Sequence, residues 1–219
     1  MNTLELLSRS YPLLIQGTLM TIQVLLGAAS ISFSLGLVMG ILSCNRLKIP
    51  VISLLVEGIA FVYRAIPFYV QLLIVYFVLP DLWGFNLEPF SASVIALGMC
   101  SAGYVAQIVR GGMNAIPDAQ WEAASTLGYD IPRSLRYIVL PQMFRNVLPA
   151  FNNELDALLK STAMASSIGM LELTRMGMNL VSREMEPVPI YLTVAFFYLC
   201  MSALLNFFTR NLEKRYVKN

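Results

Sequence analysis

The sequence predicts an all-α, polytopic membrane helix bundle with five transmembrane helices. Of its 219 residues, 57% are hydrophobic and only 13% are charged, and the mean hydropathy is +0.67. Soluble domains carry about 25% charged residues, so this chain could not cover a surface in water. Uncharged runs of bilayer-spanning length, about 20 residues, recur along it. Because a backbone in hydrocarbon must satisfy its own hydrogen bonds, each crossing is expected to be helical.

The five expected spans belong to a single membrane domain covering residues 1–219. Spans one, three and five lie in uncharged runs, whereas spans two and four contain charged residues. Gly36 and Gly40, one turn apart in the first span, are expected to let another helix pack closely. The expected spans are about 18–43, 51–79, 91–113, 146–170 and 187–210, with a polar insert at 114–145.

Lysine and arginine residues in the connections predict the orientation, because cytoplasmic loops of membrane proteins carry an excess of positive charge. If the insert is cytoplasmic, its side of the membrane holds ten of these residues and the other side three. We therefore expect the N-terminus outside and the C-terminus inside. The ten are Arg46, Lys48, Arg110, Arg133, Arg136, Arg145, Arg210, Lys214, Arg215 and Lys218; the three are Arg9, Arg175 and Arg183.

The insert has the pattern of two short helices. Asp118 is the expected N-cap of the first helix, and Gly128 lies where that helix would end in a left-handed residue. Asp130 is expected to cap the second helix, with Pro132 in its first turn. Pro141 is expected to limit that second helix. On pattern alone, an amphipathic hairpin lying on the membrane surface remains an alternative.

Residues 122–141, EAASTLGYDIPRSLRYIVLP, resemble the Glu-Ala-Ala loop of bacterial ABC importer permeases. In that family the loop forms a helix that sits in a groove of the ATPase and links nucleotide-driven closure to the membrane helices. The resemblance therefore implies a role in ATPase coupling for the residues that carry it. These are Glu122, Ala123, Ala124, Gly128, Ile138, Leu140 and Pro141.

The resemblance covers most of the chain. It includes Gly17-Thr18, residues 64–67 and 104–110, and the segment LLKSTAMASSIG after the insert. Together these look like the histidine/glutamine-type permease family of polar amino acid ABC importers, which implies a type I ABC importer transmembrane domain. The implied function is import of a polar amino acid across the bacterial cytoplasmic (inner) membrane by ATP-driven alternating access. The implied partners are ABC ATPase subunits, an extracytoplasmic substrate-binding protein, and a second permease in a homodimer or a paralogous heterodimer.

Span four is expected to have two polar faces. At about 100° per residue, Asn152, Asp156 and Lys160 share one strip of the helix, whereas Glu154 points away with Ser161 seven residues on. One face could line a pathway while the other meets a neighbouring helix or subunit. Either Asp156 and Lys160 neutralise each other and hold helices together, or these residues and Glu154 bind a zwitterion. Two acids against one base favour a cationic substrate.

Span two contains Glu57 and Arg64, seven residues apart on nearly the same helix face. Pro67 should kink this helix and free backbone carbonyls that need a partner. The stretch from Arg64 to Pro67, with Gln71 downstream, resembles the Arg-Gly-Thr-Pro segment of polar amino acid permeases, although Ala-Ile here replaces Gly-Thr. Arg64 and Gln71 are therefore candidates for the substrate pathway, and a structural pair between Glu57 and Arg64 is the alternative.

The composition argues against several other functions. The chain has no histidine, and Cys44, Cys100 and Cys200 are far apart, so no metal site, cofactor or catalytic centre is expected. There is no phosphate-binding Gly-Lys-Ser/Thr motif, so ATP must be hydrolysed by a partner chain. A net charge of +2 does not favour nucleic-acid binding. The alternative function is an ion-coupled secondary amino acid carrier, because acids inside the membrane suit proton or sodium coupling.

Overall fold

The computed structural model describes residues 3–217, and every element in that part of the chain is helical, as the sequence predicted. Lys218, counted above on the cytoplasmic side, lies outside the described residues. The α-helices are α1 (Thr3–Leu42), α2 (Pro50–Ala65), α3 (Phe68–Leu73), α4 (Leu79–Trp83), α5 (Pro89–Asn114), α6 (Asp118–Thr126), α7 (Ile131–Ser134), α8 (Leu140–Ser161), α9 (Leu173–Glu184) and α10 (Pro187–Val217). Short 3₁₀ segments, η1 (Asn45–Leu47) and η4 (Thr162–Ile168), and two π segments, η2 (Ile74–Val78) and η3 (Leu135–Val139), complete the order.

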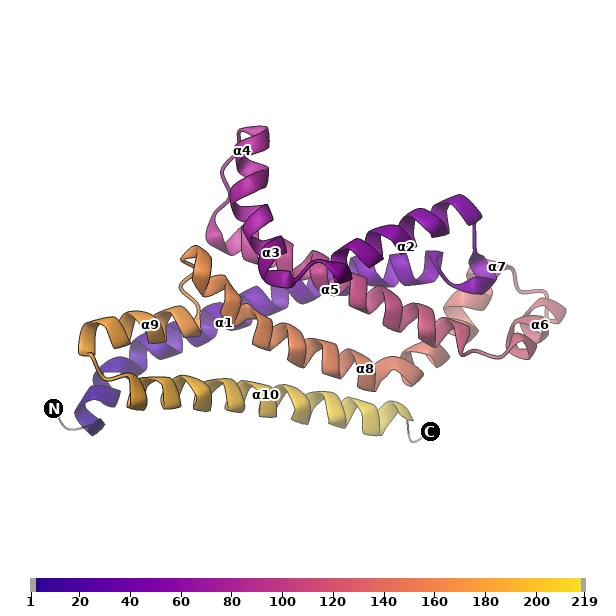
Figure 1. The fold of residues 1–219 in the computed structure, drawn as a ribbon. Helices are drawn as coiled ribbons and strands as arrows, with labels where there is room; N and C mark the ends of the chain where they lie inside the picture. The colour runs from indigo at the N-terminus through magenta and orange to yellow at the C-terminus, as the bar shows by residue number, and fades with distance from the viewer. Residues whose placement is uncertain (1–2, 218–219) are drawn as a thin grey trace.

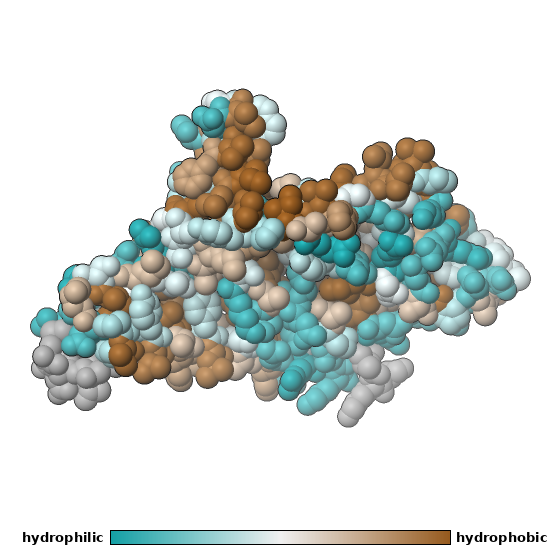
Figure 2. Space-filling model, in the orientation of Figure 1, coloured by the Kyte–Doolittle hydropathy of each residue, from teal (hydrophilic) through white to brown (hydrophobic). Residues whose placement is uncertain are grey.

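The long helices α1, α5, α8 and α10 run along one bundle, with α5 packed between α1 and α8 and with α10 against α8 (Figure 1). The short helices α6 and α7 lie at one end of this bundle, and α9 lies at the other end beside the start of α1. The arm formed by α3 and α4 projects from the side. Figure 2 shows apolar side chains gathered on this arm, on α2 and on α10, whereas hydrophilic residues gather near α6 and α7.

Three helical segments are long and apolar enough to cross a membrane, namely Ser8–Leu42, Pro89–Asn114 and Pro187–Arg215. A fourth candidate is the bent pair of Pro50–Ala65 and Phe68–Trp83. Helix α8, which covers much of the expected fourth span, is not among these candidates because charged residues interrupt it. The count of five spans therefore remains a prediction.

The expected close packing at Gly36 and Gly40 occurs between α1 and α5. A Cβ atom added at Gly36 would lie 2.5 Å from Cβ of Val105, and one added at Gly40 would lie 2.5 Å from Cβ of Val109. Both valines are fully buried. The two glycines thus let the backbone of α1 approach α5 more closely than any side chain would allow.

The expected kink at Pro67 is a complete break, because α2 and the α3–α4 arm meet at an angle of 100°. The carbonyls of Tyr63 and Ile66, which lose their helical partners at this break, each accept a hydrogen bond of 2.7 Å from Nε2 of Gln71. Gln71 is itself buried. One side chain therefore satisfies both carbonyls and stabilises the sharp turn.

The prediction that Pro141 limits the second insert helix is wrong. The chain continues as a helix from α7 through η3 into α8, and the N–H of Leu140 donates to the carbonyl of Leu135 five residues earlier. The wider π turn moves the carbonyl that the proline ring would otherwise meet. The same solution occurs before Pro80, where the N–H of Leu79 donates to the carbonyl of Ile74.

Candidate functional site

The polar insert has the two short helices that its sequence predicts, with one cap assigned wrongly. Gly128 has a left-handed φ of 79°, and the carboxylate of Asp130 accepts the N–H of Arg133 at 2.9 Å. Asp118, however, is the first residue of α6 rather than its N-cap, because Pro117 occupies that position. The Asp118 carboxylate lies 3.2 Å from Nη1 of Arg46 and so ties the insert to the α1–α2 connection.

The insert is anchored through one face of α6. Trp121 packs into the same core cluster as Val139 and Met143, and Ala124 is also turned inward and buried. Since η3 runs directly into α8, this packing places α6 against the segment that leads into α8.

The opposite face of the insert is exposed and partly apolar. Glu122, Ala123 and Gly128 are exposed, and Leu127 is 75% exposed. Ile131 and Tyr137 add further exposed apolar surface. Ile138 and Leu140 are half-buried, and Pro141 is exposed. An apolar patch at an otherwise hydrophilic end of a molecule is typical of a protein contact surface.

A central cavity of about 280 Å³ lies where the α2–α3 break faces α5 and α8. Arg64 and Glu154 reach it from opposite helices and supply one positive and one negative charge. Its lining residues are Arg64, Ile66, Pro67, Phe68, Leu97, Cys100, Ser101, Tyr104, Glu154, Ala157, Leu158 and Ser161. Here Glu154 and Ser161 form one of the two polar faces expected for the fourth span.

Glu154 is held in place by a relay of buried hydroxyls. Ser32 of α1 donates to Ser101 of α5 at 2.7 Å, and Ser101 donates to Oε1 of Glu154 at 2.6 Å. No cation pairs with this carboxylate among the described residues. Because burying an unpaired charge is costly, such a group usually serves a bound ligand or a wet cavity.

Arg64 also lacks an acidic partner among residues 8–215. Its Nε donates to the carbonyl of Ala60 at 3.2 Å, and its Nη1 donates to Oε1 of Gln107 at 2.5 Å. The alternative of a structural pair between Glu57 and Arg64 is wrong. Both side chains face α5, where Glu57 lies 3.2 Å from Nη1 of Arg110 and Arg64 meets Gln107. Glu57 also lies 3.8 Å from Nζ of Lys48.

The second polar face of α8 meets α10. Asp156 accepts hydrogen bonds from Ser202 and from Lys160, the latter at 2.5 Å. Asn152 donates to Asn206 at 3.1 Å and accepts from Thr209 at 2.6 Å. Of the sequence-predicted candidates, Asp156, Lys160 and Gln71 are thus not among the residues that line the central cavity.

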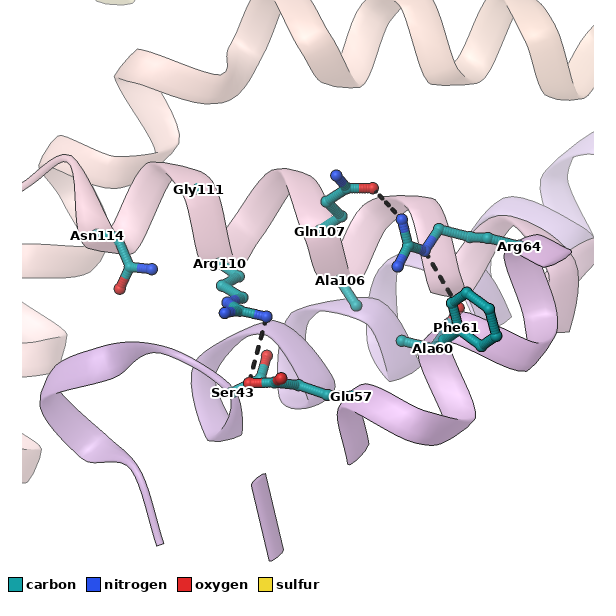
Figure 3. A pocket seen from close by; sticks show the side chains of 10 residues that line it. All are labelled: Ser43, Glu57, Ala60, Phe61, Arg64, Ala106, Gln107, Arg110, Gly111 and Asn114. Atoms are coloured by element: carbon teal, nitrogen blue, oxygen red, sulfur yellow. Dashed lines mark hydrogen bonds and ion pairs between the residues drawn. The ribbon is translucent and has the colours of Figure 1, made fainter. Parts of the chain in front are cut away.

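A second, larger cavity of about 400 Å³ lies between α2 and α5 on the insert side of Arg64. We refer to it as the loop-side cavity (Figure 3). Figure 3 shows Arg64 and Gln107 side by side at one end, and Arg110 reaching Glu57 further along α5. The lining residues are Ser43, Glu57, Ala60, Phe61, Arg64, Ala106, Gln107, Arg110, Gly111 and Asn114.

Sequence reasoning missed two contributors to these sites. Ser101 lies in an uncharged run and resembles any other small residue of a membrane helix, so only its position opposite Glu154 reveals its role. Gln107 sits in the same run, where a single amide breaks an apolar pattern. That amide was the one available clue, because polar groups inside membrane helices are rare and usually functional.

The family model for the binding-protein-dependent transport system inner membrane component matches residues 10–218. The chain belongs to this family. The arginine transport system permease protein ArtQ of Bacillus subtilis is 32% identical to this permease over 95% of the chain and 94% of the relative. The glutamine transport system permease protein GlnP of Escherichia coli K12 is 32% identical over 93% of each chain.

Solved structures agree with the family assignment. A crystal structure of an amino acid ABC transporter with histidines matches the permease with a TM-score of 0.87 and 32% identity, over 98% of this chain and 99% of that chain. The methionine transporter MetNI in an inward-facing form matches with a TM-score of 0.81 at 21% identity, over 93% and 95%, and so supports the fold alone.

The permease is therefore the inner-membrane subunit of an amino acid ABC importer with the type I fold. Its family works with an ATPase, which hydrolyses ATP, and with a substrate-binding protein. These findings do not favour the alternative of an ion-coupled secondary carrier.

Proposed function

We propose that the permease binds its amino acid as a zwitterion in the central cavity. The supporting observation is that Arg64 and Glu154 share this cavity although neither has an ion-pair partner among the described residues. The guanidinium of Arg64 suits the α-carboxylate, because its planar donors match two carboxylate oxygens. Glu154, oriented by Ser101, suits the α-ammonium group.

The charge count of the cavity favours an amino acid with a neutral, polar side chain. Arg64 and Glu154, the one base and the one acid of the cavity, bind the α-carboxylate and the α-ammonium group. The remaining polar lining comes from Cys100, Tyr104 and Ser161, which are uncharged. The sequence alone favoured a cation because it counted Asp156 as part of the site. Of the relatives named above, GlnP carries glutamine in its name and ArtQ carries arginine.

We assign Asp156 and Lys160 to the contact between α8 and α10. Asp156 accepts hydrogen bonds from both Ser202 and Lys160, and the amides of Asn152 and Asn206 form a further hydrogen bond between the two helices. Gln71 has a related role at the helix break. These residues hold the helices that form the cavity walls.

The insert is proposed to be the ATPase docking surface, with its exposed face around Glu122, Ala123 and Gly128 in contact with the partner. This assignment follows the resemblance to the Glu-Ala-Ala loop and agrees with the exposed apolar patch beside it. Closure of the ATPase would then move α8, which carries Glu154, and would open the cavity to alternate sides. The proposed orientation has the N-terminus outside and the C-terminus inside, and the working unit is a homodimer or a paralogous heterodimer.

The test is uptake of a panel of labelled amino acids into proteoliposomes that contain the assembled importer. Glu154→Gln should weaken uptake of the cognate amino acid roughly ten- to hundredfold, since an ionic hydrogen bond contributes about 1.5–3 kcal/mol. Asp156→Asn, on the same helix but outside the cavity, is the matched control and should keep the half-saturation concentration. If both variants keep the concentration dependence and rate of the wild type, Glu154 does not bind the substrate.

A further inference from the structure

The loop-side cavity shares one wall with the central cavity. Arg64 lines both, and it is the single residue common to the two sets of lining residues. A rotation of the Arg64 side chain would thus move its guanidinium from one cavity toward the other without any helix movement. The two cavities lie in sequence along the bundle, from the α2–α3 break toward the insert.

The loop-side cavity has an excess of positive charge. Arg64 and Arg110 line it, and Nζ of Lys48 lies 3.8 Å from Glu57, which is the single acid among the lining residues. Glu57 is already engaged, because Arg110 and Lys48 both approach its Oε1 atom. Three cations against one acid leave the site suited to an anion.

Neutral hydrogen-bond donors add to this preference. Oδ1 of Asn114 accepts the N–H of Asn45 at 2.9 Å, and Oε1 of Gln107 accepts from Arg64. Each amide therefore uses its oxygen internally and keeps its NH₂ group as a donor. A cavity of about 400 Å³ with guanidinium and amide donors fits a carboxylate and leaves room for the rest of an amino acid.

We infer that the loop-side cavity is a second amino-acid site on the exit route, where Arg64 and Arg110 bind the α-carboxylate after the amino acid leaves Glu154. This inference rests on the proposed function of the central cavity. Arg64 keeps hold of the carboxylate while the ammonium group loses its partner, so transfer between the sites needs no step in which the ligand is unbound. An anionic lipid headgroup would match the same charges but would not account for the wall shared with the substrate cavity.

Gly111 offers a reporter position for this site. It lines the loop-side cavity, and a Cβ atom added there meets nothing within 4 Å. Gly111→Cys is made in a Cys200→Ser background, because Cys200 is exposed whereas Cys44 and Cys100 are buried. The nucleotide-free importer, assembled with its ATPase, is placed in phosphatidylcholine nanodiscs, and alkylation by N-ethylmaleimide is followed by peptide-resolved mass spectrometry.

The probes are L-glutamine and L-arginine, each compared with its α-amide, which lacks the carboxylate. At least one of the two amino acids, at ten times its Kd, should slow alkylation of the cysteine at position 111 about tenfold. Its α-amide should leave the alkylation rate unchanged. Arg110→Gln should abolish this protection, and Arg110→Lys should restore part of it. If Arg110→Gln does not assemble, the comparison of each amino acid with its α-amide still tests whether the site binds a carboxylate.

The inference would be overturned if an amino acid and its α-amide protected the cysteine from alkylation equally, or if neither amino acid protected it. Protection that needs only phosphatidylglycerol in the nanodisc and no amino acid would assign the site to a lipid phosphate and would also overturn it. The uptake comparison of Glu154→Gln with Asp156→Asn does not use this reporter. A failure of the loop-side site is therefore distinguishable from a failure of the central cavity.

Discussion

Gln71 supplies the hydrogen-bond donors that the break at Pro67 removes from the second membrane helix. Its amide donates to the carbonyls of Tyr63 and Ile66, and the Cys100 thiol adds a longer contact of 3.7 Å to the Tyr63 carbonyl. The family resemblance pointed to Gln71 as a pathway residue. Its actual contacts indicate that it shapes the cavity by fixing the turn between α2 and α3.

Gln71→Leu should lower the thermal stability of the assembled importer. The Ile66 carbonyl would lose its Gln71 donor, whereas the Tyr63 carbonyl would keep the Cys100 thiol. A buried carbonyl left without a partner costs about 1–3 kcal/mol. The measurement is the unfolding temperature of the purified complex by intrinsic fluorescence. Gln23→Leu, at an exposed glutamine on α1, is the matched control and should leave it nearly unchanged. Equal unfolding temperatures for the two variants would contradict this role.

Glu172 is a buried carboxylate between the fourth and fifth expected spans, at the N-terminus of α9. It accepts the N–H groups of Thr174 and Arg175 at 2.8 Å each and the hydroxyl of Tyr198 at 3.0 Å. It therefore joins α9 to α10. Burial raises the pKa of this carboxyl above its ordinary value of 4.5, although the hydrogen bonds act in the opposite direction.

This raised pKa predicts a pH dependence of stability. The folded state binds the Glu172 proton more tightly than the unfolded state does, so stability falls as pH rises from about 4.5 through the folded pKa. In Glu172→Gln this contribution is absent. The unfolding temperature of wild type minus that of the variant should therefore decrease as pH rises through this window. A difference that stays constant or increases would contradict the raised pKa.

At the scale of helices, glycines that look alike in sequence have different surroundings, and only some of them allow α1 and α5 to pack closely. Gly36 faces Val105 at a distance that excludes a methyl group, whereas Gly58 on α2 faces open space. The spacing of Gly36 and Gly40 predicted close packing but not which helix approaches. Only the fold places α5 there.

Alanine substitutions at these two glycines should have opposite effects. Alanine favours a helix over glycine by about 1 kcal/mol, so Gly58→Ala should be neutral or stabilising. Gly36→Ala should destabilise the assembled importer, because its methyl group would meet Val105 at 2.5 Å. The unfolding temperatures of the two variants measure this contrast. An increase in both would show that α1 and α5 can separate without cost.

Local sequence patterns predicted many of the helices but not the geometry of the connections between them. Apolar runs located the long helices, and the cap at Asp130 and the left-handed Gly128 marked the insert correctly. The sequence predicted a helix end at Pro141 and a kink at Pro67, yet the first proline is accommodated by a π turn and the second becomes a 100° bend. The outcome at each proline depends on distant partners such as Gln71, which a local pattern does not contain.

For the candidate site, helical spacing on α8 separated the face of Glu154 from the face of Asp156 correctly. It could not say which face meets the cavity, because that depends on where α5 and α10 pack. Ser101 and Gln107 become visible as contributors only once α5 lies against α8 and α2. The preference for a cationic substrate counted Asp156 with Glu154, and so it depended on the same assignment of faces.

At the scale of the whole molecule, the insert is the proposed docking surface for the ATPase, and the sequence has no nucleotide-binding motif of its own. The exposed face of the insert and the continuous path from η3 into α8 connect that surface to Glu154. An ATPase that binds the insert differently in its two nucleotide states would shift the equilibrium between two membrane conformations. Transport and ATP hydrolysis should therefore depend on each other.

The most direct test is amino acid uptake into proteoliposomes that contain the permease, its ATPase and its binding protein, with ATP inside or absent. Uptake should require ATP, and Glu122→Lys should abolish it while leaving membrane insertion intact. Uptake without ATP that an ion gradient drives, or unchanged ATP-dependent uptake in Glu122→Lys, would contradict coupling through the insert.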